Sequence, residues 1–165
     1  NAQVSPSSAS AARSSQIEVE KAAQERAVQG LDPDARKRAE DVASRFAQAM
    51  NARTWQTSRQ QWREALAPTV SPELLKTLDV DRDWESDAQH RFVQARASTS
   101  VQVLESRAQT VQGERVDVAL MVATETTGED PWVTAPRTER PMTVVVDTTQ
   151  NRVVEQIDMT PHGGL

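Results

Sequence analysis

The spacing of apolar residues changes near residue 98 from a helical period to a strand period. Before this point, apolar residues recur every three to four positions, as they do on one face of a helix. After it, apolar and polar residues alternate in four stretches separated by short turns, as in antiparallel strands. A sheet with one solvated face needs cover for the other, and only the preceding helices can supply it. The sequence therefore predicts an α+β fold, with N-terminal helices packed on a curved four-stranded antiparallel sheet.

Three helices are expected before the sheet. Asp32 and Pro33 are typical of a capping residue and a first helical position, and they start a predicted helix over 33–50. A second helix is expected over 57–66, and a third, short one follows the Ser-Pro-Glu sequence at 71–73. The first helix has the strongest amphipathic pattern, so it is expected to cover most of the sheet.

The acidic stretch 79–90 lacks a helical pattern, and we expect an irregular loop there. The acidic side chains of this stretch, together with His90, are residue types that can bind a metal ion. A calcium loop needs a glycine at its sharp turn and a bidentate glutamate in register, and the stretch has neither. A solvated acidic loop is the preferred interpretation.

The predicted core consists of apolar residues at inward positions of the helices and strands. Trp55, which follows the first helix, is expected to fill the junction between helices. The core residues are Val42, Phe46, Met50, Trp62, Val118, Leu120, Val144, Val146 and Ile157.

The ends of the chain differ from its centre in composition. Residues 1–16 are rich in Ser and Ala and hold almost nothing large to bury, so we expect a flexible linker or stalk. Residues 17–31 are expected to form a loose helix at most. A single α+β domain is then predicted over 32–160, followed by a short tail at 161–165.

Several classes of function are disfavoured by composition. The chain has no cysteine, no tyrosine and two histidines, so thiolate chemistry is excluded and general acid–base residues are scarce. It has no glycine-rich phosphate loop and no Gly-x-Ser-x-Gly sequence. The net charge of −5 argues against a nucleic-acid partner. We therefore expect no catalytic residue, no cofactor and no metal, which means that the chain is not an enzyme.

Two tryptophans lie in predicted loops, where an aromatic side chain can anchor a protein partner. Trp132 lies between Pro131 and Pro136, and Trp84 lies in the acidic stretch. Both are candidate partner-binding residues. The alternative is that these side chains fold back over the core.

The order of elements, together with two sequence patterns, resembles the nuclear transport factor two-like (cystatin-like) superfamily. The last two predicted strands, within 140–147 and 152–158, look like the closing hairpin of such domains. The first helix carries the pattern Val42-x-x-x-Phe46-Ala47-x-Ala49-x-Asn51-x-Arg53-x-Trp55. Within the superfamily, the chain is similar to extracytoplasmic domains of membrane-anchored proteins. These include the inner-membrane assembly component of type IV secretion and conjugation machines, and the mammalian-cell-entry-associated proteins of actinobacteria.

This resemblance implies a non-catalytic scaffold of a conjugation or type IV secretion-like transfer complex in the cell envelope. Its partners would be other proteins of that complex, with weak self-association, and it would reach the membrane only through an N-terminal anchor outside this sequence. The excess of arginine over lysine fits a GC-rich, actinobacterial genome. Three alternatives remain open: a cone-shaped domain that binds a small ligand or acts as an enzyme, a transport accessory protein associated with mammalian cell entry, and a signalling or anti-sigma-type sensor domain. A pocket above about 300 Å³ with converging polar groups would favour ligand binding.

Overall fold

The computed structural model describes residues 6–157, of which residues 6–12 are described by their backbone alone. Five helices and five strands make up this part of the chain. In chain order they are α1 (Pro6–Gly30), α2 (Pro33–Asn51), β1 (Arg53–Thr54), α3 (Arg59–Leu66), α4 (Pro72–Arg82), α5 (Asp87–Gln94), β2 (Ser98–Gln112), β3 (Arg115–Thr127), β4 (Ala135–Asp147) and β5 (Arg152–Ile157).

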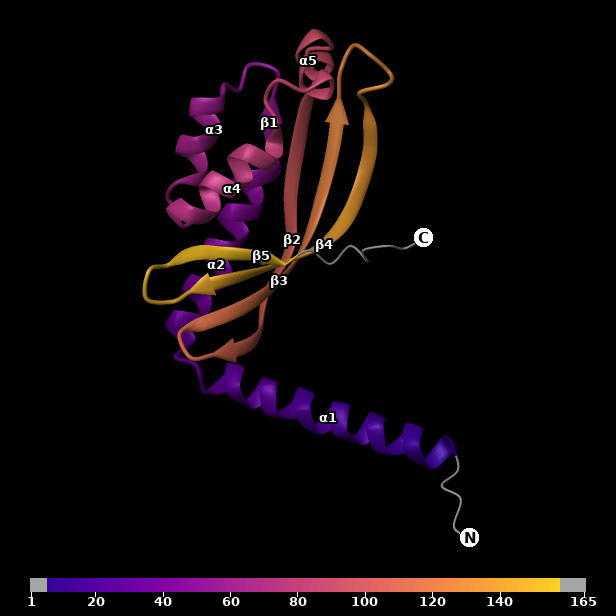
Figure 1. Cartoon of the computed structure of the whole chain (residues 1–165), viewed down its shortest axis with the longest axis vertical. Coiled ribbons are helices and arrows are strands. Elements are labelled where there is room, and N and C mark those ends of the chain that lie inside the picture. Colours follow the sequence, from indigo (N-terminus) through magenta and orange to yellow (C-terminus); the bar gives the residue numbers. More distant parts are fainter. Residues whose placement is uncertain (1–5, 158–165) are drawn as a thin grey trace.

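The strands form one antiparallel sheet in the order β1-β2-β3-β4-β5, which curls around α2 (Figure 1). The predicted α+β fold, with helices on a curved antiparallel sheet, is confirmed, but the sheet has five strands and not four. The additional strand, β1, is only two residues long and therefore has no alternating pattern by which to recognise it. Register shifts beside Leu104 and Gln109 interrupt the pairing of β2 with β3, and such bulges bend a sheet.

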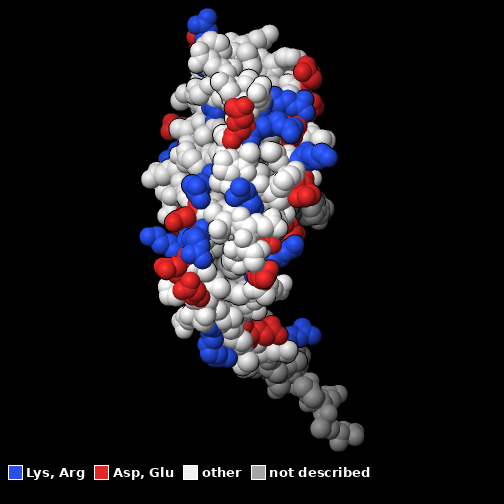
Figure 2. Space-filling view, turned by 90° about the vertical axis from the view of Figure 1, so that its left-hand side faces the viewer, with Lys and Arg blue, Asp and Glu red and all other residues white. Residues whose placement is uncertain are grey.

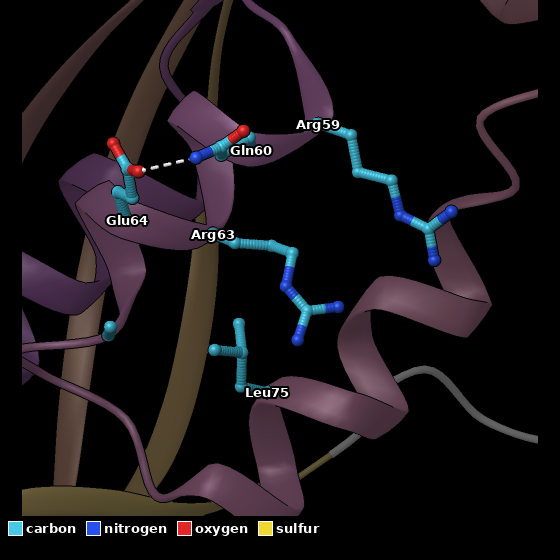
Figure 3. Close-up of a pocket in the computed structure, with 6 residues that line it drawn as sticks. Arg59, Gln60, Arg63, Glu64 and Leu75 are labelled. Atoms are coloured by element: carbon cyan, nitrogen blue, oxygen red, sulfur yellow. Dashed lines mark hydrogen bonds between the residues drawn. The ribbon is translucent and has the colours of Figure 1, made fainter.

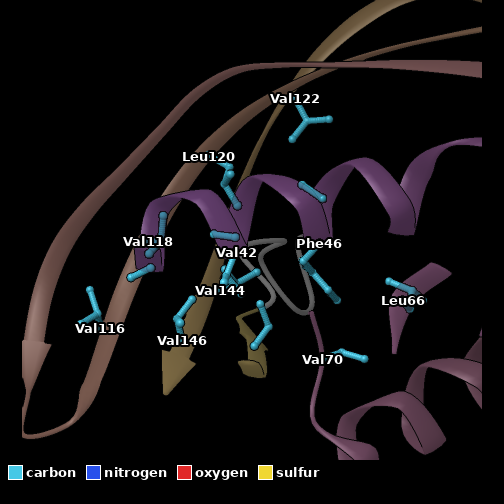
Figure 4. Packing of buried hydrophobic residues seen from close by; sticks show 14 of the residues in the cluster. Val42, Phe46, Leu66, Val70, Val116, Val118, Leu120, Val122, Val144 and Val146 are labelled. Atoms are coloured by element: carbon cyan, nitrogen blue, oxygen red, sulfur yellow. The ribbon is translucent and has the colours of Figure 1, made fainter. Parts of the chain in front are cut away.

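Helix α2 packs into the concave face of the sheet through a stripe of small and large apolar residues. Ala39, Ala43 and Ala47 let the helix approach the strands closely, while Val42 and Phe46 fill the space between them. Figure 4 shows Val42 and Phe46 among the valines of β3 and β4. Asp32 occupies the N-cap position, but its side chain makes no capping hydrogen bond, so Pro33 alone marks this helix start.

Seven of the nine predicted core residues are buried, and two are only half-buried. Met50 lies in the last turn of α2, at the edge of the core. Ile157 lies on the other face of the sheet, because a register shift lets Val146 pair with Val153 and Val145 with Glu155. This extra residue inverts the alternation of β5 beyond Val153. The seven buried residues are Val42, Phe46, Trp62, Val118, Leu120, Val144 and Val146.

Two segments of the helical half differ from the sequence-based expectation. Within 79–90, α4 continues to Arg82 and α5 begins at Asp87, where the hydroxyl of Ser86 accepts a hydrogen bond from Gln89 N at 3.1 Å. This Ser cap was missed because the acids around it obscured the apolar face that Phe92 provides.

At the N-terminus, α1 occupies part of the segment for which a linker was expected, and it projects away from the rest of the domain (Figure 1). Its abundant alanines favour helix even without an apolar face. The C-terminal end of α1 and the residue that follows it contact the domain. There, Val28 and Leu31 pack against the core, and the Gln24 side chain accepts a hydrogen bond from Val111 N of β2 at 3.4 Å. The predicted tail at 161–165 lies outside the described residues.

Replacing the largest side chain of the α2 stripe tests this packing. We expect Phe46→Ala to lower the free energy of unfolding by about 3–5 kcal/mol, because Phe46 is fully buried and the sheet cannot close the cavity. Chemical denaturation measures the change. The control is Leu104→Ala, at a side chain that is 41% exposed. A loss below about 1 kcal/mol for Phe46→Ala would show that α2 does not hold the core together.

A second prediction concerns α1. Deleting residues 1–16 should leave the melting temperature nearly unchanged, because the described side chains of this segment, 13–16, are all exposed. Deleting residues 1–31 should lower it, since Val28 and Leu31 are then lost from the core. Differential scanning calorimetry of the two truncated proteins gives the comparison, and an equal effect of both deletions would refute this account.

Candidate protein-interaction site

The end of the molecule opposite α1 carries an exposed tryptophan on a rigid turn. Trp132, in the loop between β3 and β4, is 84% exposed. Its backbone N–H donates to the Asp130 carboxylate at 3.0 Å, and Val133 N donates to the Asp130 carbonyl at the same distance. Beside it, the Thr134 hydroxyl donates to Pro131 O at 2.8 Å. These bonds hold the turn in one conformation, so the indole is presented without a large entropic penalty.

Helix α5 supplies the charged neighbour of this tryptophan. Arg91 Nε donates to the Asp130 carboxylate at 3.0 Å, and its guanidinium lies 6.0 Å from the Trp132 ring centre. The pKa of Asp130 is lowered, first by the backbone hydrogen bond from Trp132 and then by the hydrogen bond from Arg91. The carboxylate therefore stays ionised at neutral pH and fixes both the turn and the arginine.

A second exposed tryptophan lies at the same end. Trp55 was expected inside the helix junction, but it is 37% exposed. The pairing of Arg53 and Thr54 with β2 carries the chain out of the junction, so that Trp55 N donates to Ala97 O at 2.8 Å. Arg96 lies 5.6 Å from the Trp55 ring, as Arg91 lies beside Trp132.

We call this group the tip surface: Trp55, Arg91, Arg96, Asp130 and Trp132. It lies at the end of the long strands, where α5 and the β3–β4 loop meet (Figure 1). A small cluster of Phe92, Ala95, Ala97 and Val133 packs beneath it, apart from the main core. Exposed tryptophan and arginine side chains on a rigid support are typical of interaction hot spots.

Trp84, the other candidate partner-binding residue, lies inside a cluster of its own. It is half-buried, and its ring meets that of Trp62 edge to face at 5.6 Å. Its Nε1 donates to Asp79 Oδ1 at 3.1 Å, and the Arg82 guanidinium lies 4.0 Å from its ring centre. Because these contacts occupy both the ring and the N–H group of Trp84, its side chain packs within the fold and is not presented to a partner.

Asp79 is the buried charge at the centre of that cluster, with a side chain only 3% exposed. Arg59 and Arg63 of α3 reach it with nitrogen–oxygen distances of 2.6 and 2.7 Å. The pKa of Asp79 is lowered, mainly by the hydrogen bond from Arg59 and further by that from Trp84. This ion-pair network attaches α3 to α4.

A groove of about 440 Å³ follows the junction of α3 and α4. Figure 3 shows Arg59 and Arg63 extending from α3 toward α4 along this groove, with Gln60 bonded to Glu64 beside them. Asp79 forms ion pairs with both arginines, and Glu64 also lines the groove, so two carboxylates balance the two guanidinium groups and little free charge is left to bind a ligand.

Two observations on the described residues bear on metal and acid–base chemistry. These residues hold no cluster of three or more His, Asp or Glu side chains that could bind a metal ion. The described carboxyls whose pKa departs from the ordinary value are Asp79, Asp130 and Asp147. The pKa of each is lowered, which is the opposite of what a general acid needs.

On the side that carries α3 and α4, basic and acidic side chains are interspersed, so this face has no continuous basic surface for nucleic acid (Figure 2). No helix in the described part of the chain is both long enough and apolar enough to span a membrane.

Comparison with known proteins identifies the fold. No protein-family model matches the chain, and no curated protein matches its sequence. The crystal structure of CagV, a VirB8 homologue of the type IV secretion system of Helicobacter pylori, is similar with a TM-score of 0.54 and 10% identity, over 73% of this chain and 95% of that chain. The NMR structure of the putative transfer protein TraH from the Gram-positive conjugative plasmid pIP501 is similar with a TM-score of 0.50 and 7% identity, over 76% of this chain and 96% of that chain.

At such low identity these likenesses show a shared fold. The expected resemblance to components of type IV secretion and conjugation machines is therefore confirmed at the level of fold. The resemblance to mammalian-cell-entry-associated proteins and the actinobacterial origin stay predictions.

The Asp79 network leads to a pH-dependent prediction. Asp79→Asn should lower the free energy of unfolding by about 1–3 kcal/mol at pH 7, because two charge-assisted bonds are lost while an amide oxygen can still accept from Trp84. The folded-state pKa is lowered, so the stabilisation is present above the ordinary value of 3.8 and is lost as the pH falls through the folded-state pKa.

The difference between wild type and variant should therefore shrink in acid. Urea denaturation from pH 7 down to pH 2.5 gives this profile, with the exposed Asp41→Asn as the matched control. A difference that does not change with pH would contradict the assigned role of the charge.

Proposed function

We propose that this chain is a non-catalytic scaffold domain of a macromolecular transfer complex related to type IV secretion and conjugation machines. The observation that carries the proposal is the fold, which accounts for nearly the whole of two solved transfer-complex proteins, CagV and TraH. The tip surface supports it independently, because Trp132 is 84% exposed on a hydrogen-bonded turn, where an indole is suited to contact another protein. The lowered carboxyl pKa values favour a scaffold over an acid–base enzyme.

The proposal includes an extracytoplasmic location, with attachment to the membrane through a segment on the N-terminal side of α1. The direction of α1 is consistent with this arrangement, because the helix leads away from the domain at the end opposite the tip surface (Figure 1). A tether at one end would leave Trp132 pointing away from the anchor. Topology mapping of the full-length gene product with reporter fusions tests the location, and a cytoplasmic reporter signal on this domain would refute it.

We further propose that the tip surface contacts another protein of the complex and that Trp132 is its main anchor. The exposed aromatic rings supply apolar contact area. Arg96, which forms no ion pair among the described residues, adds a positive charge that suits a partner with acidic groups around an apolar centre. Self-association is expected to be weak by comparison.

A double substitution at the tip surface tests this role. Trp55→Ala with Trp132→Ala should reduce DNA or protein transfer in the host at least tenfold, because hot-spot truncation weakens binding by about 2 kcal/mol or more. Trp132→Ala alone should leave the folded domain stable, since Trp132 is 84% exposed, whereas Trp55 is only 37% exposed, so the thermal stability of the double variant is measured alongside transfer. The matched control is Val80→Ala, at an exposed apolar residue of α4 that is 74% exposed. Normal transfer by the double variant, at wild-type protein levels, would exclude the tip surface as the contact.

A further inference from the structure

A pocket of about 350 Å³ opens between the end of α2, helix α4 and strands β2 and β3. Met50, Trp62 and Leu78 provide apolar walls, and Arg53 and Arg82 line it with positive charge. Its volume lies within the range that small-molecule sites occupy. Unlike the groove between α3 and α4, it brings together charges that the fold has not neutralised.

The two arginines are like charges held half-buried near one another. The pKa of Arg82 is lowered to about 10, mainly by burial and further by the charge of Arg53, and the negative charge of Asp79 offsets only part of this. Burial also lowers the pKa of Arg53. Both remain protonated at neutral pH, so the folded protein keeps two positive charges in an unfavourable position. An anion between them would remove this penalty.

Neither arginine forms an ion pair among the described residues. Arg53 donates to the neutral side chain of Gln89 at 3.3 Å and lies 3.9 Å from the Phe92 ring centre. Arg82 lies 5.0 Å from the Trp62 ring centre and 4.0 Å from that of Trp84. Aromatic faces orient a guanidinium group and leave its N–H groups able to bind an anion.

Hydrogen-bond donors around the pocket also lack acceptors. In the described part of the chain, two buried side-chain nitrogens have no partner, and these are Trp62 Nε1 and Arg82 Nε. Trp62 is only 2% exposed, so water does not readily compensate its N–H group. Both atoms can only donate, and buried donors without a partner are rare in folded proteins. A ligand that supplies hydrogen-bond acceptors would therefore satisfy these donors, and a negative charge on that ligand would also balance the two arginines.

We propose that this pocket binds an organic carboxylate, whose oxygens accept hydrogen bonds from Arg53 and Arg82 while its apolar part contacts Met50, Trp62 and Leu78. Guanidinium groups bind carboxylates with two parallel hydrogen bonds, which gives the site its orientation. The apolar walls favour such a molecule over inorganic phosphate, which has no apolar part. Asp81, an exposed residue that also lines the pocket, repels the anion and limits its affinity. The proposal does not depend on the scaffold function, because the tip surface does not line the pocket.

The probe is benzoate, and the matched control ligand is benzamide, which has the same shape without the charge. Titrations followed by ¹H–¹⁵N correlation spectra use the indole N–H signal of Trp62, assigned through Trp62→Phe. Benzoate should shift this signal saturably, and benzamide should not. Equal shifts with both ligands, or a response to inorganic phosphate without one to benzoate, would overturn the proposal.

Substitutions then locate the site. Arg53→Gln and Arg82→Gln should each weaken benzoate binding about tenfold or more, whereas Arg107→Gln, at an exposed arginine of β2 outside the pocket, should not. Asp81→Asn should strengthen binding, which no loss of folding can imitate. Unchanged affinity in both Arg53→Gln and Asp81→Asn would exclude the pocket.

A carboxylate can reach the pocket as a free small molecule or as the C-terminus of a peptide. A second titration compares benzoate with acetyl-Ala-Phe that ends in a free carboxylate, and uses the C-terminal amide of the same peptide as its control. Tighter binding of the peptide acid identifies a protein partner as the source. Tighter binding of benzoate identifies a small metabolite. Failure of every carboxylate to bind would refute the proposal.

Discussion

The rest of the structure depends on the packing of α2 into the concave face of the sheet. Alanines along the inner stripe of α2 let the backbones approach, and Phe46 fills the space that the curled strands leave. The shorter helices attach to this unit through Trp62 and Leu66 of α3. The segment before α4 joins the sheet edge, where Val153 N donates to Thr69 O at 2.7 Å and Ser71 N donates to Val153 O at 2.9 Å. The helical half is thereby bound to both the face and the edge of the sheet.

This arrangement satisfies the buried charges unequally. The carboxylate oxygens of Asp79 accept hydrogen bonds from Arg59, Arg63 and Trp84, and the bonds from the two arginines link α3 to α4. Arg53 and Arg82 are half-buried, and neither forms an ion pair among the described residues. The first arrangement links two helices of the fold, whereas the second leaves hydrogen-bond donors that the fold itself does not use.

The candidate sites lie where the helical cover ends. The tip surface projects beyond the main core on its own small apolar cluster, and the pocket opens beside the last turn of α2. Arg53 lies between the two regions, because it lines the pocket and contacts Phe92 beneath the tip surface. Folds of this kind host both scaffolds and ligand-binding proteins, so the assignment depends on these sites and not on the topology.

The sequence by itself determined the division into a helical half and a sheet half, and the buried stripe of α2, because both follow from residue spacing along one segment. It did not reveal β1, which is too short for a period, or the inversion of β5 that moves Ile157 to the outer face. Only the tertiary structure placed Trp84 inside the fold and Trp55 at the tip. It alone brought Arg53, Arg82 and Trp62 together in one pocket, because these residues come from three different elements. Their proximity depends on how α3, α4 and β1 pack, and no local pattern encodes that.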